Sequence, residues 1–227
     1  MMNITFYGHS CFSVTVNKKK LLFDPFITGN DLAKDININA IDADYILLSH
    51  GHQDHMADAE SIAKRTGATI IAAYEVAMWF AAKGVEKYQP MNTGGKWKFD
   101  FGTVKCVNAI HSSGLPDGSY GGNPMGFIIM NDEQNFYYSG DTALTLDMQL
   151  VPMFANIDFA LLPIGDNFTM GMEDAVQAAK MVQTKMVIGL HYDTFGFIKI
   201  DHQKAIDLFK KNDLELRLLV IGETIEI

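Results

Sequence analysis

The chain lacks the features that mark membrane-spanning and secreted proteins. No apolar stretch in its 227 residues approaches the roughly 20 residues that a helix needs to cross a bilayer. The N-terminus has neither a basic region nor an apolar signal core, and Asn3-Ile4-Thr5-Phe6 already has the pattern of a strand. The two cysteines, Cys11 and Cys106, are too few for a disulfide framework. We therefore expect a cytoplasmic protein with reduced core thiols and no membrane insertion.

Positive charge is also scarce. The chain has 18 Lys and Arg residues against 27 Asp and Glu residues, which gives a net charge of −9. Its one run of three basic residues, Lys18-Lys19-Lys20, is typical of a solvated turn between strands. Because phosphate binding relies on clustered Lys and Arg, the sequence predicts no nucleic-acid partner. A small-molecule substrate is expected instead, and assembly into homo-oligomers is left open.

Histidine, in contrast, is concentrated in one place. Three of the seven histidines lie in His50-Gly51-His52-Gln53-Asp54-His55, directly after the apolar run Tyr45–Ser49. Their spacing puts them on no single helical face. A tight loop after a strand can turn them towards one point, and Gly51 permits its unusual dihedral angles. Imidazole and carboxylate are ligands for zinc, and also for iron or manganese, so the motif predicts a metal site.

Hydrophobic patterning predicts strands and helices in both halves of the chain. Strands are expected at Asn3–Tyr7, Cys11–Val16, Leu21–Phe23, Asp44–Ser49, Ala68–Ala72, Thr103–Ala109, Gly126–Met130, Phe136–Ser139, Asp158–Leu162, Met186–Leu190 and Leu216–Ile221. Helices are expected at Ala57–Arg65, Tyr74–Lys83, Glu173–Gln183 and His202–Lys211. Interspersed elements of this kind indicate a layered α/β architecture. Since no linker-like tract interrupts them, one domain over residues 1–227 is expected.

Further polar residues follow other predicted strands. His111 comes after Thr103–Ala109, Asp141 lies in Ser139-Gly140-Asp141-Thr142, and His191 follows Met186–Leu190. Ligand sites of open α/β sheets gather at the carboxyl ends of the strands. We therefore expect these residues to join the histidine cluster.

The order of these residues resembles the metallo-β-lactamase superfamily. The resemblance covers nearly the whole chain, and Asp24 in Leu22-Phe23-Asp24-Pro25 matches the early aspartate of that family. Gly8-His9-Ser10 and the segment from Pro163 to Gly171 resemble its lactonase and phospholipase-D-like branch, closest to the small metal-dependent hydrolases. The resemblance implies an α/β fold in the form of an αββα four-layer sandwich.

The resemblance also implies two divalent metal ions, zinc first, with manganese, nickel or iron as alternatives. The ligands that it implies are His50, His52 and His111 for one ion, Asp54, His55 and His191 for the other, and Asp141 between them. Two cations about 3.5–4 Å apart can share a water and hold it as hydroxide for attack. Asp54 could also orient this nucleophile or pass on its proton. The alternative to a catalytic site is a metal ion that only stabilises the fold, although structural zinc sites are usually rich in cysteine.

Other candidate residues have two interpretations each. Asp24 is expected to hydrogen-bond the histidine loop, or to be an ordinary turn residue before Pro25. His9 is expected to contact substrate or leaving group, or to be a loop hydrogen-bonder. The segment from Ser112 to Asn123 is expected to be a substrate-facing lid, or a plain flexible loop. Asp166 and Asn167 are expected to line the pocket, while Thr169 could simply cap the next helix.

Within the resembling superfamily, hydrolysis is the leading expectation. Between Asp141 and His191 there is no room for the large inserted domain of its nucleic-acid-processing members. His52 stands where the flavo-diiron oxidoreductases have a glutamate. A small ester, lactone or phosphodiester is expected, with an anionic one favoured because the resembling lactonases act on a phosphorylated sugar lactone. Iron-dependent oxidation of the persulfide-dioxygenase kind and a non-catalytic metal-binding role remain the alternatives.

Overall fold

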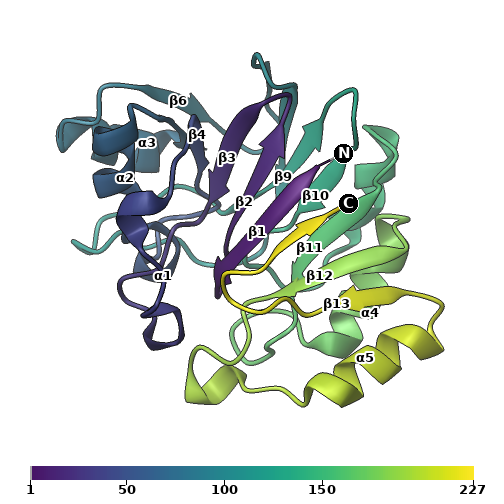
Figure 1. The fold of residues 1–227 in the computed structure, drawn as a ribbon. Coiled ribbons are helices and arrows are strands. Elements are labelled where there is room, and N and C mark those ends of the chain that lie inside the picture. The colour runs from purple at the N-terminus through teal and green to yellow at the C-terminus, as the bar shows by residue number, and fades with distance from the viewer. Residues whose placement is uncertain (1) are drawn as a thin grey trace.

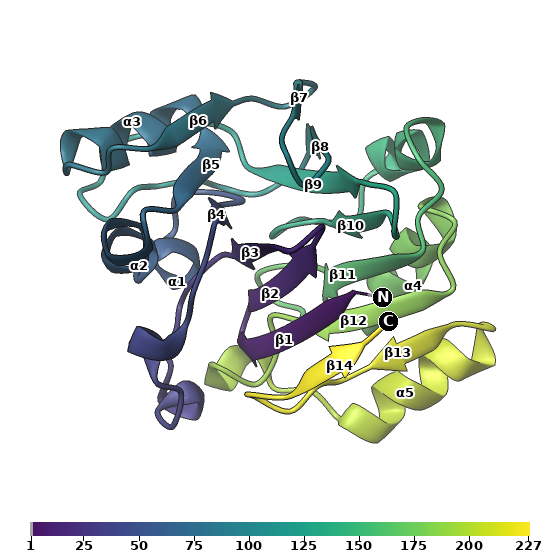
Figure 2. The ribbon, with the colours of Figure 1, turned by 45° about the horizontal axis from the view of Figure 1, so that its top comes forward.

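The computed structural model describes residues 2–227 as two seven-stranded mixed sheets packed face to face between helices (Figures 1 and 2). The predicted αββα sandwich is confirmed. The first sheet contains, in spatial order, β14 (Thr224–Glu226), β1 (Asn3–Gly8), β2 (Cys11–Val16), β3 (Lys19–Phe23), β4 (Tyr45–Leu47), β5 (Thr69–Ala73) and β6 (Tyr88–Met91). The second contains β13 (Glu215–Arg217), β12 (Met186–Leu190), β11 (Phe159–Pro163), β10 (Phe136–Tyr138), β9 (Met125–Met130), β8 (Thr103–Asn108) and β7 (Lys96–Lys98).

Strand direction brings the ends of several strands to one edge of the sandwich. Strands β3 to β6 run parallel to one another, as do β10 to β13. Parallel neighbours end at the same edge, so the residues that follow them are collected there. Strand β14 pairs antiparallel with β1, Asn3 opposite Glu226, and the two termini lie side by side (Figure 1).

Helices cover the outer faces of both sheets. Helices α2 (Ala59–Thr66) and α3 (Tyr74–Ala82) lie against the first sheet, and α4 (Met172–Met181) and α5 (His202–Lys211) against the second (Figure 2). Helix α2 buries Ala59, Ile62 and Ala63 on one face and ends at Gly67, whose φ of 71° only glycine adopts without cost. The short helices are η1 (Asp31–Ala33), η2 (Ile38–Ala40), α1 (Gln53–Met56), η3 (Leu146–Met153) and η4 (Gly196–Ile198).

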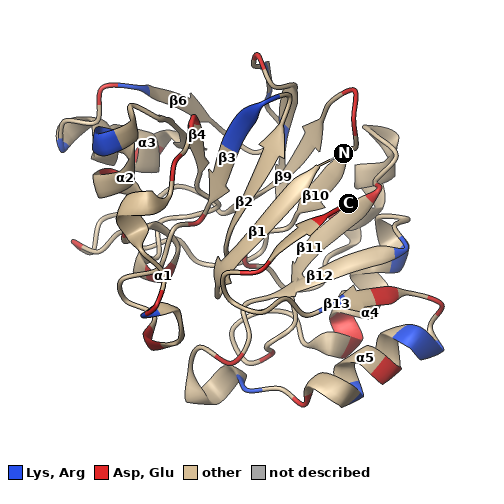
Figure 3. Cartoon of the chain, viewed as in Figure 1, with Lys and Arg blue, Asp and Glu red and all other residues tan. Residues whose placement is uncertain are grey.

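One part of the core lies between the two sheets and is rich in aromatic rings, and a second part lies between the second sheet and helices α4 and α5. Phe23 stacks on Phe12 within the first sheet at 4.5 Å between ring centroids, and meets Phe127 and Tyr138 of the second sheet edge to face. Strands β1, β2, β9 and β10 carry no Lys, Arg, Asp or Glu, and the charged residues lie on helices, on loops and on other strands such as β3 (Figure 3). Such a core holds the strand ends rigidly, because packed interiors resist displacement.

Most predicted elements are present, and the differences have local causes. The predicted strand Leu216–Ile221 is wrong beyond Arg217, where the chain leaves the second sheet for the first and Gly222 N donates to Phe6 O. Strands β6, β7 and β14 were not predicted. The first contains a proline at the sheet edge, and the side chains of β7 are all exposed, so neither has the alternation of a half-buried strand.

Between residues 2 and 227, no helix combines the length and the apolar character needed to cross a membrane.

Candidate metal centre

The polar residues predicted from the sequence meet at the common edge of the two sheets. His50 follows β4, His111 follows β8, Asp141 follows β10 and His191 follows β12. His9 stands just after β1, and its carbonyl oxygen accepts a hydrogen bond of 2.9 Å from His191 N. This bond ties the end of a first-sheet strand to the end of a second-sheet strand, so both sheets contribute to one site.

A first cluster consists of His50, His52 and His111. Nδ1 of His52 lies 2.9 Å from Nε2 of His50, and the His111 ring lies 5.1 Å from each of the other two rings. The Ser49 hydroxyl donates to Asp24 and can therefore accept from His50 Nδ1 at 2.9 Å. That arrangement leaves His50 Nε2 with a lone pair facing His52, as a metal ligand requires.

The pKa values of this cluster favour neutral rings. Burial, followed by the nearby His55, holds the pKa of His50 well below its usual range. Burial also lowers the pKa of His52 and of His111. Neutral imidazole is the form that binds metal, so these rings need not lose a proton at neutral pH.

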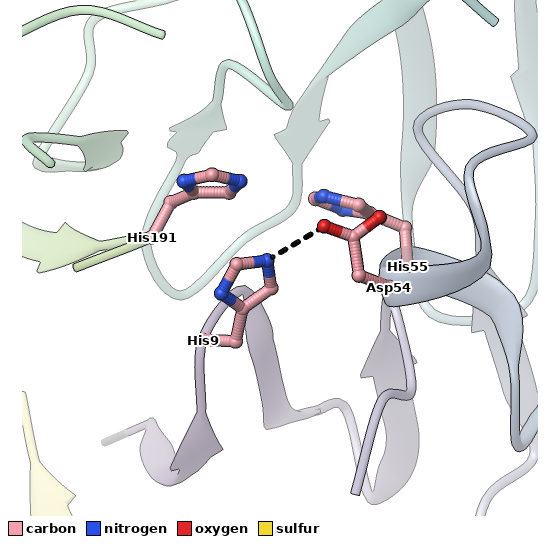
Figure 4. A group of neighbouring side chains, drawn as sticks. All are labelled: His9, Asp54, His55 and His191. Carbon is pink, nitrogen blue, oxygen red and sulfur yellow. Dashed lines mark ion pairs between the residues drawn. The ribbon is translucent and has the colours of Figure 1, made fainter. Parts of the chain in front are cut away.

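A second cluster consists of His9, Asp54, His55 and His191, whose side chains point towards one another (Figure 4). One ligand atom from each lies within 4.8 Å of the others. Asp54 and His55 come from α1, which begins at Gln53 directly after the histidine loop. The short helix therefore places two adjacent side chains of the motif in this cluster, while His50 and His52 belong to the first.

His9 is part of the second cluster. Its Nδ1 lies 3.0 Å from the Thr194 hydroxyl, which donates to Tyr192 O and can accept from the ring. Its Nε2 is 3.3 Å from Asp54 Oδ2 (Figure 4). Burial, and then the neighbouring His191, lower the pKa of His9 to about 4, so the ring is neutral at pH 7. In the tautomer protonated at Nδ1, the Nε2 lone pair and the Asp54 oxygen face each other and form a place for a cation, whereas in the other tautomer Nε2 donates to Asp54.

Asp141 lies between the two clusters. Its Oδ2 is 3.1 Å from His55 Nε2 and 3.0 Å from His191 Nε2 in the second cluster, and 3.6 Å from His111 Nε2 in the first. Its Oδ1 is buried and has no hydrogen-bond partner among the described residues. One carboxylate thus reaches both ligand groups, which is the arrangement that the family resemblance implied for Asp141.

Asp24 holds the histidine loop from beneath. Its Oδ1 accepts from Ser49 N at 2.8 Å. Its Oδ2 accepts from Ser49 Oγ at 2.5 Å, Tyr138 OH at 2.5 Å and His55 Nδ1 at 2.8 Å. The carboxylate is fully buried, and it contacts His55 of the second cluster directly and His50 of the first through Ser49, so it can orient one ligand of each cluster.

The donor set fits divalent metal ions. His55 Nε2 and Asp141 Oδ1 are buried and make no hydrogen bond, although buried polar atoms are normally satisfied. Burial disfavours a proton on His55, but Asp141 and Asp24 outweigh it and hold its pKa well above the usual range. In the metal-free protein, a protonated His55 ring therefore supplies the positive charge that a metal ion would supply between these carboxylates. Imidazole with carboxylate, without cysteine, is a typical donor set for zinc, iron or manganese at catalytic sites.

The backbone at these strand ends is strained. His9, Asp24 and His191 have φ values of 55°, 39° and 54°, in the left-handed region that residues other than glycine seldom adopt. Each costs of order 1–3 kcal/mol and persists only where the surroundings enforce it. Positive φ also occurs in turns elsewhere, at Asn17, Lys18, Gln183 and Asp213, but its presence at three residues beside the candidate ligands favours a functional role for this edge.

A cavity of about 740 Å³ opens above both clusters. Its floor includes His52, Asp54, His111, Asp141 and His191, and its wall includes Ser112, Phe168, Thr194, Phe195, Gly196 and Phe197. Asp166 and Asn167, predicted as pocket residues, do not line this cavity. Both adopt positive φ, and the Asp166 side chain packs against Gly171, which leaves Phe168 at the tip of the loop.

The glycine-rich segment after His111 braces the histidine loop. Ser113 Oγ accepts from Gly51 N at 3.0 Å and donates to Gly121 O at 2.9 Å, and Leu115 is buried. Ser112 Oγ lies 3.2 Å from His52 Nε2 and lines the cavity. The expected lid is therefore anchored next to the first cluster for much of its length.

Comparison with known proteins decides the family. Residues 3–191 match the family described as "Beta-lactamase superfamily domain". The chain belongs to the metallo-β-lactamase superfamily. It is 55% identical over 227 residues to a "UPF0173 metal-dependent hydrolase" of Christiangramia forsetii and 52% identical over 226 residues to one of Flavobacterium johnsoniae, with 100% of each chain covered. A solved structure, a metallo hydrolase of Ignicoccus hospitalis, is 32% identical with a TM-score of 0.89, covering 99% of this chain and 97% of that one.

This chain thus belongs to a family of metal-dependent hydrolases, and the family predicted from its motifs is confirmed. Every candidate metal ligand falls within the matched residues 3–191. Four wall residues of the cavity lie beyond them, namely Thr194, Phe195, Gly196 and Phe197. Sequence reasoning missed these residues and Phe168, because an aromatic residue in a loop gives no signal of its own until the fold brings it to the site.

Proposed function

We propose that this metallo-β-lactamase family member hydrolyses small esters, lactones or phosphodiesters with two divalent metal ions, zinc first. The observation that carries the proposal is the pair of ligand clusters joined by Asp141. His50, His52 and His111 would hold one ion, and Asp54, His55 and His191 the other. When bound, such ions supply Lewis acidity and a hydroxide nucleophile at neutral pH.

The side chains have separate roles in this proposal. Burial opposes ionisation of Asp54, but His9 and His55 outweigh it and hold its pKa well below the usual range. Asp54 is therefore a carboxylate that can orient a nucleophile and accept its proton. His9, neutral and held by Thr194, would add a further donor to the second ion and face the leaving group.

The dimensions of the cavity support a small-molecule substrate. Its volume of about 740 Å³ lies within the range usual for small-ligand pockets, about 300–1,000 Å³. None of the residues that line it in the described chain is Lys or Arg, which nucleic-acid binding would require. We therefore also propose that the protein has no nucleic-acid partner.

Metal analysis combined with a substrate panel tests the proposal. The protein is stripped of metal, reloaded with zinc, manganese, nickel or iron, and analysed for metal content. Each form is then assayed with para-nitrophenyl acetate, bis-para-nitrophenyl phosphate, sugar-phosphate lactones and single-stranded RNA, and oxygen uptake is followed with a persulfide. We expect two ions per chain and metal-dependent hydrolysis of small substrates.

Three outcomes would contradict the proposal. Rapid RNA cleavage would refute the substrate class. Oxygen consumption by the iron form without hydrolysis would place the chain with the persulfide dioxygenases. Metal binding without turnover of any substrate would favour the non-catalytic role.

A further inference from the structure

The wall of the cavity is aromatic, whereas its floor carries the metal ligands. Phe168, Phe195 and Phe197 are 50%, 36% and 79% exposed, although phenylalanine is usually buried. All three line the same cavity. Three exposed rings around one cavity form an apolar surface that a ligand can cover.

The three rings come from loops that follow neighbouring strands. Phe168 lies in the loop after β11, and Phe195 and Phe197 in the loop after β12. The rings of Phe168 and Phe197 meet edge to face at 6.3 Å, and Phe195 lies 5.4 Å from the ring of His9. The aromatic wall, meaning these three phenylalanines, therefore starts beside the second cluster and continues outward across both loops.

The loop after β12 is held firmly despite its exposed rings. Asp193 N donates to Ile198 O at 2.8 Å, and its carboxylate accepts from Ile200 N at 3.1 Å and lies 2.6 Å from His202 Nε2. Ile198 is fully buried beneath the loop. The wall is thus pre-formed, and little ordering entropy would be lost when a ligand covers it.

Charge around the cavity disfavours an anionic group at the wall. Among the described residues that line it there is no Lys or Arg, and Asp54 and Asp141 are the charged side chains. A phosphate placed against the phenylalanines would lose its hydration without gaining a cationic partner. An apolar group has no favourable hydration to lose at the wall, and it removes aromatic surface from water.

We propose that Phe168, Phe195 and Phe197 select substrates with an uncharged apolar group next to the bond that is cleaved. The proposal rests on the hydrolytic function above and specifies its substrate class. This substrate class differs from the phosphorylated substrate that the sequence favoured. The metal ions would attract negative charge only at the reacting atoms, and not at the aromatic wall.

A series of para-nitrophenyl esters tests the selection on the zinc-loaded protein. Acetate, butyrate and hexanoate esters lengthen the apolar acyl group, and the hemisuccinate ester carries a carboxylate at similar length to the butyrate. We expect kcat/KM to rise about tenfold or more from acetate to hexanoate, and to be lower for hemisuccinate than for butyrate. A preference for hemisuccinate, or no dependence on chain length, would overturn the inference.

Two variants assign the effect to the wall. Phe197→Ala and Phe168→Ala should each lower kcat/KM for the hexanoate ester about tenfold, mainly through KM, and lower it for the acetate ester by a smaller factor. Phe154→Ala is the matched control, because this ring is also exposed, at 43%, but lies against Lys105 outside the cavity. Equal losses on both esters, or an equal effect of the control, would contradict the assignment.

A binding measurement separates this inference from the hydrolytic proposal. Acetohydroxamic and hexanohydroxamic acids are titrated calorimetrically into the zinc-loaded protein and the Phe197→Ala variant, with size-exclusion chromatography alongside. Tighter binding of the longer acid, lost in the variant, supports the wall even if no ester is cleaved. Equal binding of the two acids, no binding of either, or a change of oligomeric state without a change of selectivity would show that the wall does not select substrate.

Discussion

Replacing Asp24 tests whether a buried carboxylate outside the cavity controls metal binding. Asp24 accepts four hydrogen bonds, two from Ser49 and one each from Tyr138 and His55. In Asp24→Asn, the amide oxygen can keep the three bonds made by Oδ2, but the amide NH₂ then faces Ser49 N. One buried donor loses its acceptor, so we expect a stability loss of about 1–3 kcal/mol.

The alanine variant should be more severe. Asp24→Ala removes all four acceptor contacts, and at about 1 kcal/mol for each net hydrogen bond the loss is on the order of 4 kcal/mol. Domains of this kind are stable by only about 5–15 kcal/mol in total. Asp24→Asn is therefore the variant to use for metal binding, because it should remain folded.

The effect on metal binding follows from His55. In Asp24→Asn, His55 Nδ1 donates to a neutral amide oxygen instead of a carboxylate, so the ring is held less firmly towards the second cluster and its Nε2 is a weaker metal ligand. Losses of such orienting partners weaken metal affinity about 10–100-fold. Zinc affinity would be measured by competition with a chromogenic chelator, and stability by urea unfolding of the metal-free protein.

Asp58→Asn is the matched control. Asp58 is also buried and accepts from Ile27 N at 2.6 Å, Thr28 N at 3.0 Å and Thr28 Oγ1 at 2.5 Å, none of which belongs to a candidate ligand. It should lose stability to a similar extent and keep its zinc affinity. If both variants weakened zinc equally, or if Asp24→Asn left the affinity unchanged, our reasoning about His55 would be refuted.

Three further predictions concern the ligands themselves. Asp141→Ala should reduce hydrolysis to the background rate while circular dichroism shows a folded protein; turnover within tenfold of wild type would contradict its place between the clusters. Asp141 and Asp24 hold the pKa of His55 high against the effect of burial, so zinc binding to the metal-free protein should release the proton of His55, and zinc affinity should rise with pH. Proton release would be measured by calorimetry in buffers of different ionisation enthalpy. Zinc binding without proton release would contradict this prediction. Gly165→Ala should destroy the second cluster, because its Cβ would lie 2.1 Å from His191 O. The control is Gly114→Ala, whose Cβ would have no atom within 4 Å, and it should bind two ions as wild type does. Equal metal contents of the two variants in elemental analysis would show that the backbone adapts to the new Cβ.

Much of the candidate ligand set could be predicted from the sequence, because its members lie in the segments that follow apolar strands. His111, Asp141 and His191 are far apart along the chain, yet the rule that strand ends gather at one edge was enough to group them. The family resemblance then suggested how they divide between two ions. Metal number and identity, and the single domain over residues 1–227, stay predictions.

The roles of Asp24 and His9 needed coordinates. A carboxylate before Pro25 has the same local pattern whether it braces a turn or a metal ligand, and only the approach of Tyr138 and Ser49 distinguishes the two. His9 likewise meets Asp54 only because β1 and α1 end at the same edge.

The sequence by itself determined the layered fold and the family, and it named most of the polar residues that the structure groups at one edge, since these depend on strand patterning and on side-chain chemistry at strand ends. Only the tertiary structure decided what surrounds that chemistry. Phe168, Phe195 and Phe197 carry no pattern that distinguishes them from core phenylalanines, and Asp166 and Asn167 seemed more suitable from their polarity alone. The backbone of two loops turns the polar residues aside and presents the aromatic rings to the cavity, and that choice depends on long-range contacts that no local pattern encodes.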